Sequence, residues 1–112
     1  MKLEFQDKKL GAACETQRSR VRAFGADRAT RLQKRLSVLS AAMNLEELRH
    51  VPGRFHELKH DRAGQITADL DHPYRLVFVP VIAEAERPQH ANGYVWSKIT
   101  HVSIVEITDT HD

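Results

Sequence analysis

The sequence has one cysteine, no long apolar run and no apolar leader within residues 1–10. Cys14 alone cannot form an intramolecular disulfide, which fits a reducing compartment, and we expect it to be a small buried side chain. The longest apolar stretch, residues 76–83, is interrupted by Pro80 and is far too short to cross a bilayer. With no secretory leader either, these absences predict a cytoplasmic protein with no membrane partner.

What the sequence does contain is typical of a small globular protein. It has 112 residues, of which 41% are hydrophobic and 29% are charged. Two independent cores would not fit into that length, so residues 1–112 are expected to form one domain. No internal repeat, low-complexity tract or linker divides the chain.

The net charge of +2 hides an uneven distribution of charge along the chain. Residues 1–42 contain ten Lys or Arg and four Asp or Glu, which gives a local net charge of +6. Residues 43–112 contain seven Lys or Arg and eleven Asp or Glu, which gives a local net charge of −4. The first part is therefore expected to attract an anionic partner, either nucleic acid or an acidic protein segment.

The first half of the chain has the spacing of amphipathic helices. Apolar residues recur at steps of four, three and four at Leu32, Leu36, Leu39 and Met43. This spacing predicts a helix over about residues 27–42, with Asp27 as its N-cap. Another face of that helix carries three arginines, Arg28, Arg31 and Arg35. A second helix is expected within residues 8–23, ending near Gly25.

After Pro52-Gly53 the spacing changes from helical to alternating. Strands are expected within residues 1–5, 55–58, 65–70, 74–79 and 102–107, with a turn over residues 71–73. In the fourth of these strands, Tyr74 and Leu76 would face the core and Arg75 would point to the other side.

Helices followed by strands predict an α+β fold. We expect two N-terminal helices packed on one face of a small antiparallel β-sheet, with the other face open. The polar segment of residues 84–97 contains Pro88 and Asn92-Gly93 and is expected to be a long loop or an extended hairpin.

Several residues have the chemistry that metal-free RNA cleavage requires. Such cleavage needs a general base for the 2′-hydroxyl, a general acid for the leaving 5′-oxygen and cations for the phosphorane. Histidine suits both proton transfers, and the planar guanidinium of arginine suits the phosphate. The chain offers these types in three places, namely residues 54–62, Arg75 and the Asp109-Thr110-His111 ending.

The residue types alone leave other roles open. His56 would serve equally as a hydrogen-bonded strand histidine, Arg75 as a surface ion-pair residue, and His60 as a plain surface residue. His56 and His60 are four residues apart, which suits a metal site only on a helix, and Pro52-Gly53 argues against a helix there. We therefore expect no metal and no other cofactor.

The block Pro52-Gly53-Arg54-Phe55-His56-Glu57-Leu58-Lys59, followed by Asp61-Arg62, Gly64 and Tyr74-Arg75-Leu76-Val77-Phe78, resembles the signature of the HigB toxins. These toxins belong to the RelE/ParE superfamily of toxin–antitoxin systems. The ending Asp109-Thr110-His111 is similar to the family's terminal Asp-Tyr-His, with Thr110 in the place of Tyr. The resemblance is strongest over residues 52–78, and residues 81–98 form a longer segment than the family pattern has.

The resemblance implies two helices on an antiparallel sheet and cleavage of mRNA in the ribosomal A site. It also implies a cognate antitoxin, a helix-turn-helix protein of the HigA type, through which the toxin would contact operator DNA. His56 and His111 would be the proton-transfer pair in unassigned order, assisted by Asp109, and Arg75 would hold the scissile phosphate. Further phosphate contacts would come from Arg54, Lys59 and Arg62. Contacts with ribosomal RNA or the antitoxin would come from Arg28, Arg31 and Arg35.

Two other functions stay open at this point. ParE-like members of the superfamily poison DNA gyrase without cleaving RNA. A decayed toxin would only bind its antitoxin and contribute to repression of their operon, and Thr110 is the residue that motivates this alternative.

Overall fold

A mixed sheet forms the centre of the molecule. The computed structural model describes residues 1–83, 85 and 93–110. Within these residues, five strands lie in the order β1-β5-β4-β3-β2. Their bounds are β1 (Lys2–Phe5), β2 (His56–Glu57), β3 (Ile66–Asp69), β4 (Tyr74–Pro80) and β5 (His101–Asp109).

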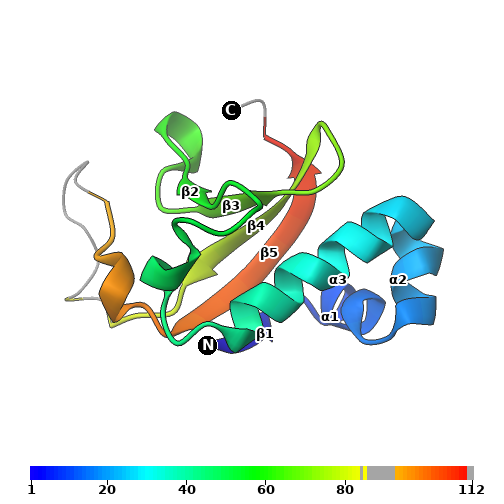
Figure 1. Cartoon of the computed structure of the whole chain (residues 1–112), viewed down its shortest axis with the longest axis horizontal. Coiled ribbons are helices and arrows are strands. Elements are labelled where there is room, and N and C mark those ends of the chain that lie inside the picture. Colours follow the sequence, from blue (N-terminus) through cyan, green and yellow to red (C-terminus); the bar gives the residue numbers. More distant parts are fainter. Residues whose placement is uncertain (84, 86–92, 111–112) are drawn as a thin grey trace.

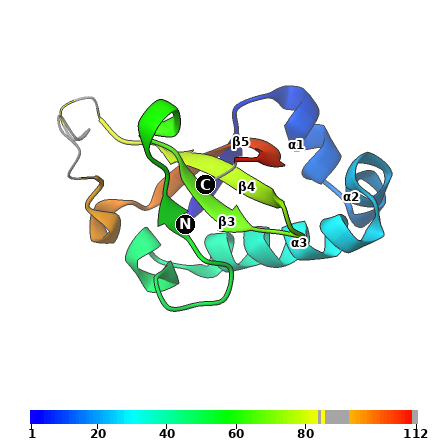
Figure 2. The same cartoon turned by 90° about the horizontal axis from the view of Figure 1, so that it is seen from above.

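The helices precede most of the strands along the chain. They are α1 (Lys8–Cys14), α2 (Gln17–Phe24) and α3 (Ala26–Ala41), and single 3₁₀ turns follow at η1 (Leu45–Leu48), η2 (His60–Arg62) and η4 (Trp96–Lys98). Figures 1 and 2 show α3 running along one side of the sheet, with η2 on the opposite side. The expected α+β fold is confirmed. None of the helices in the described part of the chain is long and apolar enough to span a membrane.

The helix expected within residues 8–23 is divided into α1 and α2. The Thr16 side chain accepts a hydrogen bond from the backbone N–H of Ser19, and the Ser19 hydroxyl accepts one from the backbone N–H of Thr16. This capping box starts a new helix, because it satisfies N–H groups that a helix N-terminus leaves without partners. The helical spacing alone did not reveal the break.

The start and end of α3 also differ from expectation. Gly25, with φ of 85°, occupies the N-cap position, and Asp27 lies in the first turn instead. Because the helix ends at Ala41, Met43 lies beyond the apolar face that it was expected to extend and is 76% exposed. The short turn after it is capped by the Asn44 side chain, which accepts from the backbone N–H of Glu47.

The expectation of an antiparallel sheet is wrong for one pair of strands. The sheet is mixed, because β1 pairs with β5 in parallel while the other neighbours are antiparallel. The chain enters the sheet at β1, leaves it through all three helices and returns to pair with β1 only at β5. A parallel pair needs such a long connection, whereas the antiparallel pair of β3 and β4 is joined by a short turn.

The core lies between α3 and one face of the sheet. Leu32 and Leu39 of α3 are fully buried in one apolar cluster with Leu76, Phe78 and Ile104. Cys14 is 5% exposed in the same cluster, and burial raises the pKa of its thiol because the thiolate would lose its hydration. The expectation that Cys14 is a small buried side chain is confirmed.

A β-bulge in β5 decides which side chains face the core. Val77 pairs with Glu106 and Phe78 pairs with Ile104, so Val105 is an extra residue. Simple alternation would place Ile104 and Glu106 on the same face. Because of the bulge, Ile104 faces the core and Glu106 lies on the opposite face.

Candidate functional site

Two rows of cross-strand neighbours lie on the sheet face opposite α3. One row is His56, Thr67, Val77 and Glu106, and the next is Asp69, Arg75 and Thr108. Directly paired residues in antiparallel strands point to the same side, so each row places its side chains on one face. The prediction that Arg75 points away from the helix side is consistent with this pairing.

The side chain of Arg75 is held at the centre of this face. Its Nη1 donates to the Thr110 hydroxyl at 2.8 Å, and its Nε lies 3.3 Å from an Asp69 carboxylate oxygen. That second contact is an ion pair without good hydrogen-bond alignment, because the same Asp69 oxygen is buried and has no hydrogen-bond partner. The Arg75 side chain is only 14% exposed, so its guanidinium is fixed in position by both contacts.

The sequence predicted that this face would be open, and that prediction is wrong. Arg62 reaches from η2 across the sheet, and its Nη1 donates to Gln65 at 2.8 Å and to Glu106 at 3.3 Å. Val77, which pairs with Glu106, is fully buried on the same face. We conclude that the η2 segment covers this part of the sheet.

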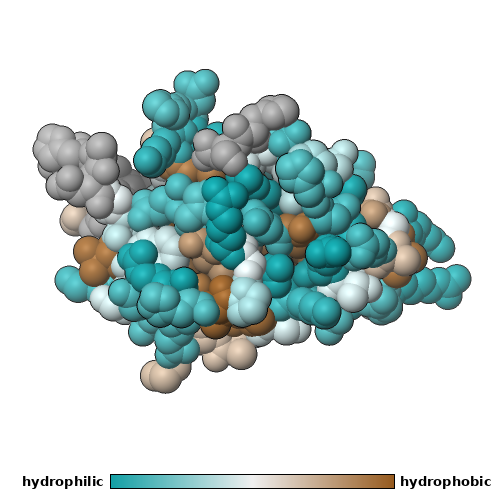
Figure 3. All heavy atoms as spheres, turned by 45° about the horizontal axis from the view of Figure 1, so that its top comes forward, coloured by the Kyte–Doolittle hydropathy of each residue, from teal (hydrophilic) through white to brown (hydrophobic). Residues whose placement is uncertain are grey.

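A hollow of about 210 Å³ lies between η2 and the end of β5. It is lined by Lys59, His60, Asp61, Arg62 and Thr110. Two cations, one carboxylate, an imidazole and a hydroxyl therefore line the same space, and Thr110 joins it to the Arg75 guanidinium. In the space-filling view, hydrophilic side chains cover most of the surface turned toward the reader (Figure 3). An anionic group of phosphate type fits such a lining.

The other predicted site residues are distributed more widely. His56 lies at the β2 edge of the face, and its Nδ1 is 2.8 Å from the backbone oxygen of Arg54. Arg54 itself is exposed and has a φ of 52°. His111 lies outside the described residues. Among the predicted residues, the structure therefore brings Lys59, Arg62 and Arg75 together around Thr110.

Asp109 does not lie on the Arg75 face. It pairs with Tyr74, whose ring packs against Arg28 of α3, so this end of β5 places Asp109 on the helix side. Thr110, the next residue, reaches Arg75 on the other side. The predicted assisting role of Asp109 would require it to act from the α3 side.

The three arginines of α3 have partners within the protein. Arg28 donates three hydrogen bonds to Asp71 at 2.9 to 3.2 Å, and its guanidinium stacks 3.7 Å from the centre of the Tyr74 ring. The hydrogen bonds to Asp71 raise the pKa of Arg28, and those from Arg28 lower the pKa of Asp71. Arg35 donates to the Asp69 backbone oxygen at 2.8 Å, and the more exposed Arg31 pairs with Asp27 at 3.4 Å. Their contact with RNA or an antitoxin stays a prediction.

A second group of contacts ties residues 93–98 to the site. The Glu57 carboxylate accepts from the Trp96 indole N–H at 2.8 Å and from the Tyr94 backbone N–H at 3.2 Å. The Tyr94 hydroxyl donates to the Gly64 backbone oxygen at 2.7 Å, just after η2. The long segment expected over residues 84–97 thus supports the η2 loop at its far end, while residues 84 and 86–92 lie outside the description.

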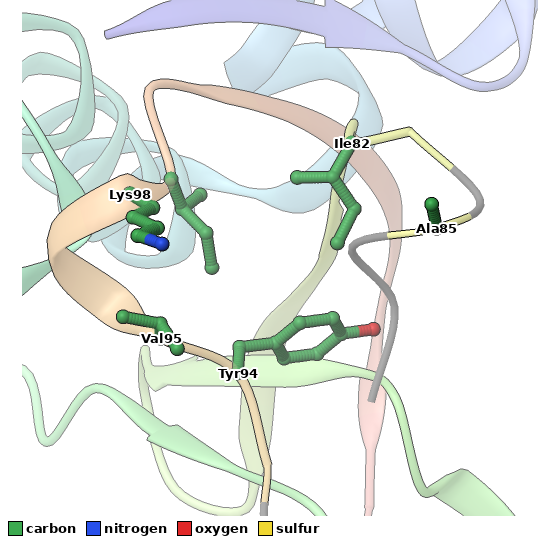
Figure 4. Close-up of a pocket in the computed structure, with 6 residues that line it drawn as sticks. Ile82, Ala85, Tyr94, Val95 and Lys98 are labelled. Carbon is green, nitrogen blue, oxygen red and sulfur yellow. The ribbon is translucent and has the colours of Figure 1, made fainter. Parts of the chain in front are cut away.

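An apolar hollow of about 270 Å³ adjoins these contacts. Ile82 and Tyr94 face each other across it in Figure 4, and its lining also includes Val95, Lys98, Ile99 and Ala85. Apart from the Lys98 ammonium and the Tyr94 hydroxyl, the described residues of this lining offer little for proton transfer or phosphate binding. The hollow near η2 is therefore the better candidate site.

Sequence reasoning missed three residues of the candidate site. His60 was expected to be an ordinary surface residue, and it is exposed, but it also lines the hollow. Asp69 and Glu106 were not singled out, although each pairs with a site arginine. The strand pattern could have predicted only that Asp69 pairs with Arg75, because the two residues flank the expected turn. Among residues 1–83, 85 and 93–110, no three His, Cys, Asp or Glu side chains are grouped as metal ligands would be.

The fold has a counterpart among solved structures. The chain aligns with the YoeB/ParE toxin from Agrobacterium tumefaciens over 97% of its own length and 98% of the other, with a TM-score of 0.57 and 13% sequence identity. A scan against protein-family models finds no match, and a search of curated proteins finds no similar sequence. At that identity, the similarity shows the fold alone, which is RelE/ParE-like.

Proposed function

We propose that this chain is the toxin component of a type II toxin–antitoxin system, of the HigB kind, and that it cleaves mRNA on the ribosome in the cytoplasm. The observation that carries this proposal is the hollow in which Lys59, Arg62 and Thr110 lie together, with Arg75 bound to Thr110. The toxin fold and the signature over residues 52–78 support it. Lys59 and Arg62 in the lining favour an anionic substrate, and RNA is the anionic substrate that a toxin of this fold would meet on the ribosome.

The proposed reaction needs neither a metal nor another cofactor. A general base removes the proton of a 2′-hydroxyl, the 2′-oxygen attacks phosphorus, and the bond from phosphorus to the 5′-oxygen breaks. A general acid protonates that 5′-oxygen, leaving a 2′,3′-cyclic phosphate. His56 and His111 are the proposed proton-transfer pair, and Asp109 is proposed to assist them.

Positive charge would stabilise the phosphorane that forms during the attack. Arg75 is proposed to hold the scissile phosphate, and Lys59, Arg62 and Arg54 to bind neighbouring phosphates. Arg75 is well suited to this role because Asp69 and Thr110 already fix its orientation, so little reorganisation is needed when the charge develops.

The proposed partners follow from the same assignment. A cognate helix-turn-helix antitoxin of the HigA type would silence the toxin, and the pair would contact operator DNA through the antitoxin. Arg31 is the most exposed of the three α3 arginines in the isolated chain. It is therefore the one proposed to contact ribosomal RNA or the antitoxin. Arg28 and Arg35 would contribute mainly through the internal contacts already described.

The deciding experiment is cleavage of a defined mRNA by the purified protein, with and without programmed ribosomes. No divalent metal is added beyond what the ribosomes require. The proposal expects new 3′ ends within A-site codons, only when ribosomes are present. Intact mRNA, with the protein shown to be folded, would contradict the enzymatic proposal.

One observation favours a second candidate, a toxin relative that binds its antitoxin without cleaving RNA. Thr110 stands where the HigB pattern has Tyr, and its hydroxyl accepts a hydrogen bond from Arg75. Tight antitoxin binding together with unaffected growth on solo expression would select this candidate. Accumulated gyrase–DNA cleavage complexes in expressing cells would instead select a ParE-like gyrase poison.

A further inference from the structure

The hollow near η2 contains a histidine that the proposed mechanism does not use. His60 lines the hollow together with Lys59, Asp61, Arg62 and Thr110. Its side chain is exposed, so a bound RNA strand could reach it. A site with two cations for phosphate and an imidazole in the same space has both of the group types that RNA cleavage requires.

The backbone presents His60 in a defined way. Its φ of 57° lies in the left-handed region, which few residues other than glycine occupy outside turns and functional sites. Both ends of the loop are tied down. The Leu58 backbone N–H donates to Gln65 at 2.9 Å, and the Tyr94 hydroxyl donates to Gly64 at 2.7 Å. His60 is therefore carried by an anchored turn.

The contact of His56 separates the roles of the two histidines. A backbone carbonyl oxygen can only accept a hydrogen bond, so the His56 Nδ1 that lies 2.8 Å from the Arg54 oxygen must carry the hydrogen. The neutral ring then has its lone pair on Nε2, which is the form that a general base needs. This contact favours His56 as the base and leaves the acid to be assigned.

We propose that His60, in place of His111, is the general acid that protonates the leaving 5′-oxygen, an assignment that rests on the proposed endonuclease function. As the bond from phosphorus to O5′ breaks, the His60 imidazolium gives its proton to O5′ and becomes neutral, while His56 Nε2 takes the proton of the 2′-hydroxyl. Lys59, Arg62 and Arg75 hold the phosphate between them. The Asp61 side chain lines the same hollow, and the Glu106 carboxylate pairs with Arg62.

The test uses a leaving group that needs no acid. Programmed ribosomes carry an mRNA with either the ordinary 5′-oxygen or a 5′-sulfur at the scissile position, because a thiolate leaves without protonation. Single-turnover cleavage of the oxygen substrate by His60→Ala should fall by about 10²- to 10⁴-fold. Cleavage of the sulfur substrate should stay close to that of the parent protein.

Matched variants make each outcome decisive. Asparagine at position 60 tolerates the left-handed backbone but cannot transfer the proton, so His60→Asn should behave like His60→Ala. The control is His50→Ala, at an exposed histidine outside the site, which should cleave like the parent protein. Unchanged cleavage by both His60 variants, equal losses on the two substrates, or sulfur rescue of His111→Ala instead would each overturn the assignment while leaving the endonuclease function in place. A parent protein that cleaves neither substrate would overturn both.

Discussion

Arginines on the two sides of the sheet have the same chemistry but different surroundings. On the α3 side, Arg28 is bound to a carboxylate and an aromatic ring, and it fastens the β3–β4 turn to the helix. On the η2 side, Arg62 and Arg75 each have a carboxylate partner, yet Arg62 lines a hollow and Arg75 contacts another of its residues. The comparison teaches that a basic stretch of sequence does not identify a binding surface until the partners of each arginine are known.

Among the arginines on the two sides of the sheet, the largest effect is expected at Arg75. Arg75→Ala should reduce mRNA cleavage about 10²- to 10³-fold, because it removes a positioned cation from the developing negative charge. The measurement is single-turnover cleavage on programmed ribosomes. The matched control is Arg22→Ala at an exposed position of α2, which should cleave like the parent. If the two variants cleaved equally well, the claim that the η2-side arginines serve cleavage would be wrong.

A stability effect without a catalytic effect is expected at Arg28. Arg28→Met should lower the free energy of unfolding by about 1–3 kcal/mol, because it leaves the Asp71 carboxylate without its hydrogen-bonded partner. Denaturant unfolding measures this change. Arg31→Met is the control and should cost less than about 0.5 kcal/mol, since its pair with Asp27 is exposed. Loss of cleavage by folded Arg28→Met would show that the α3 side also serves the site.

A smaller effect is expected from pH. The pKa of Asp71 is lowered in the folded state, chiefly by the hydrogen bonds from Arg28, so folding favours its charged form. The resulting stabilisation is complete above the ordinary carboxyl pKa of about 3.9 and is lost as the pH falls through the lower folded value. Unfolding at pH 7 and about pH 3 should therefore show a weaker acid dependence for Asp71→Asn than for the parent. An identical dependence would mean that this pair contributes little.

Much of the fold was predictable from local pattern. The alternation over residues 65–70 and 74–79 and the apolar spacing of α3 reflect burial of one face, which each segment records in its own sequence. These patterns gave the α+β class and the side on which Arg75 lies.

Features that depend on distant residues could not be predicted in the same way. Arg28 and Asp71 are 43 positions apart, and only the folded chain shows that they neutralise each other. The covering of the sheet by η2 depends on the reach of Arg62 to Glu106, 44 positions away. The approach of Arg75 to Thr110 rather than Asp109 depends on an irregularity in β5. Contacts of this kind between distant residues determine which side chains form the site. The spacing of apolar residues along the chain carries no information about these contacts.

The bulge at Val105 resets the phase of β5 for everything that follows it. If Val105 instead paired with Val77, every later residue of β5 would move to the opposite face of the sheet. The Asp109 carboxylate would then replace the Thr110 hydroxyl beside Arg75. Val105 is also the one position where β5 can lose a residue and keep both pairings, because Ile104 and Glu106 already pair with adjacent residues of β4. Deletion of Val105 would thus leave every other residue of β5 on its present face of the sheet. Deletion of Thr108 would instead move Asp109 to the Arg75 face and Thr110 to the α3 side.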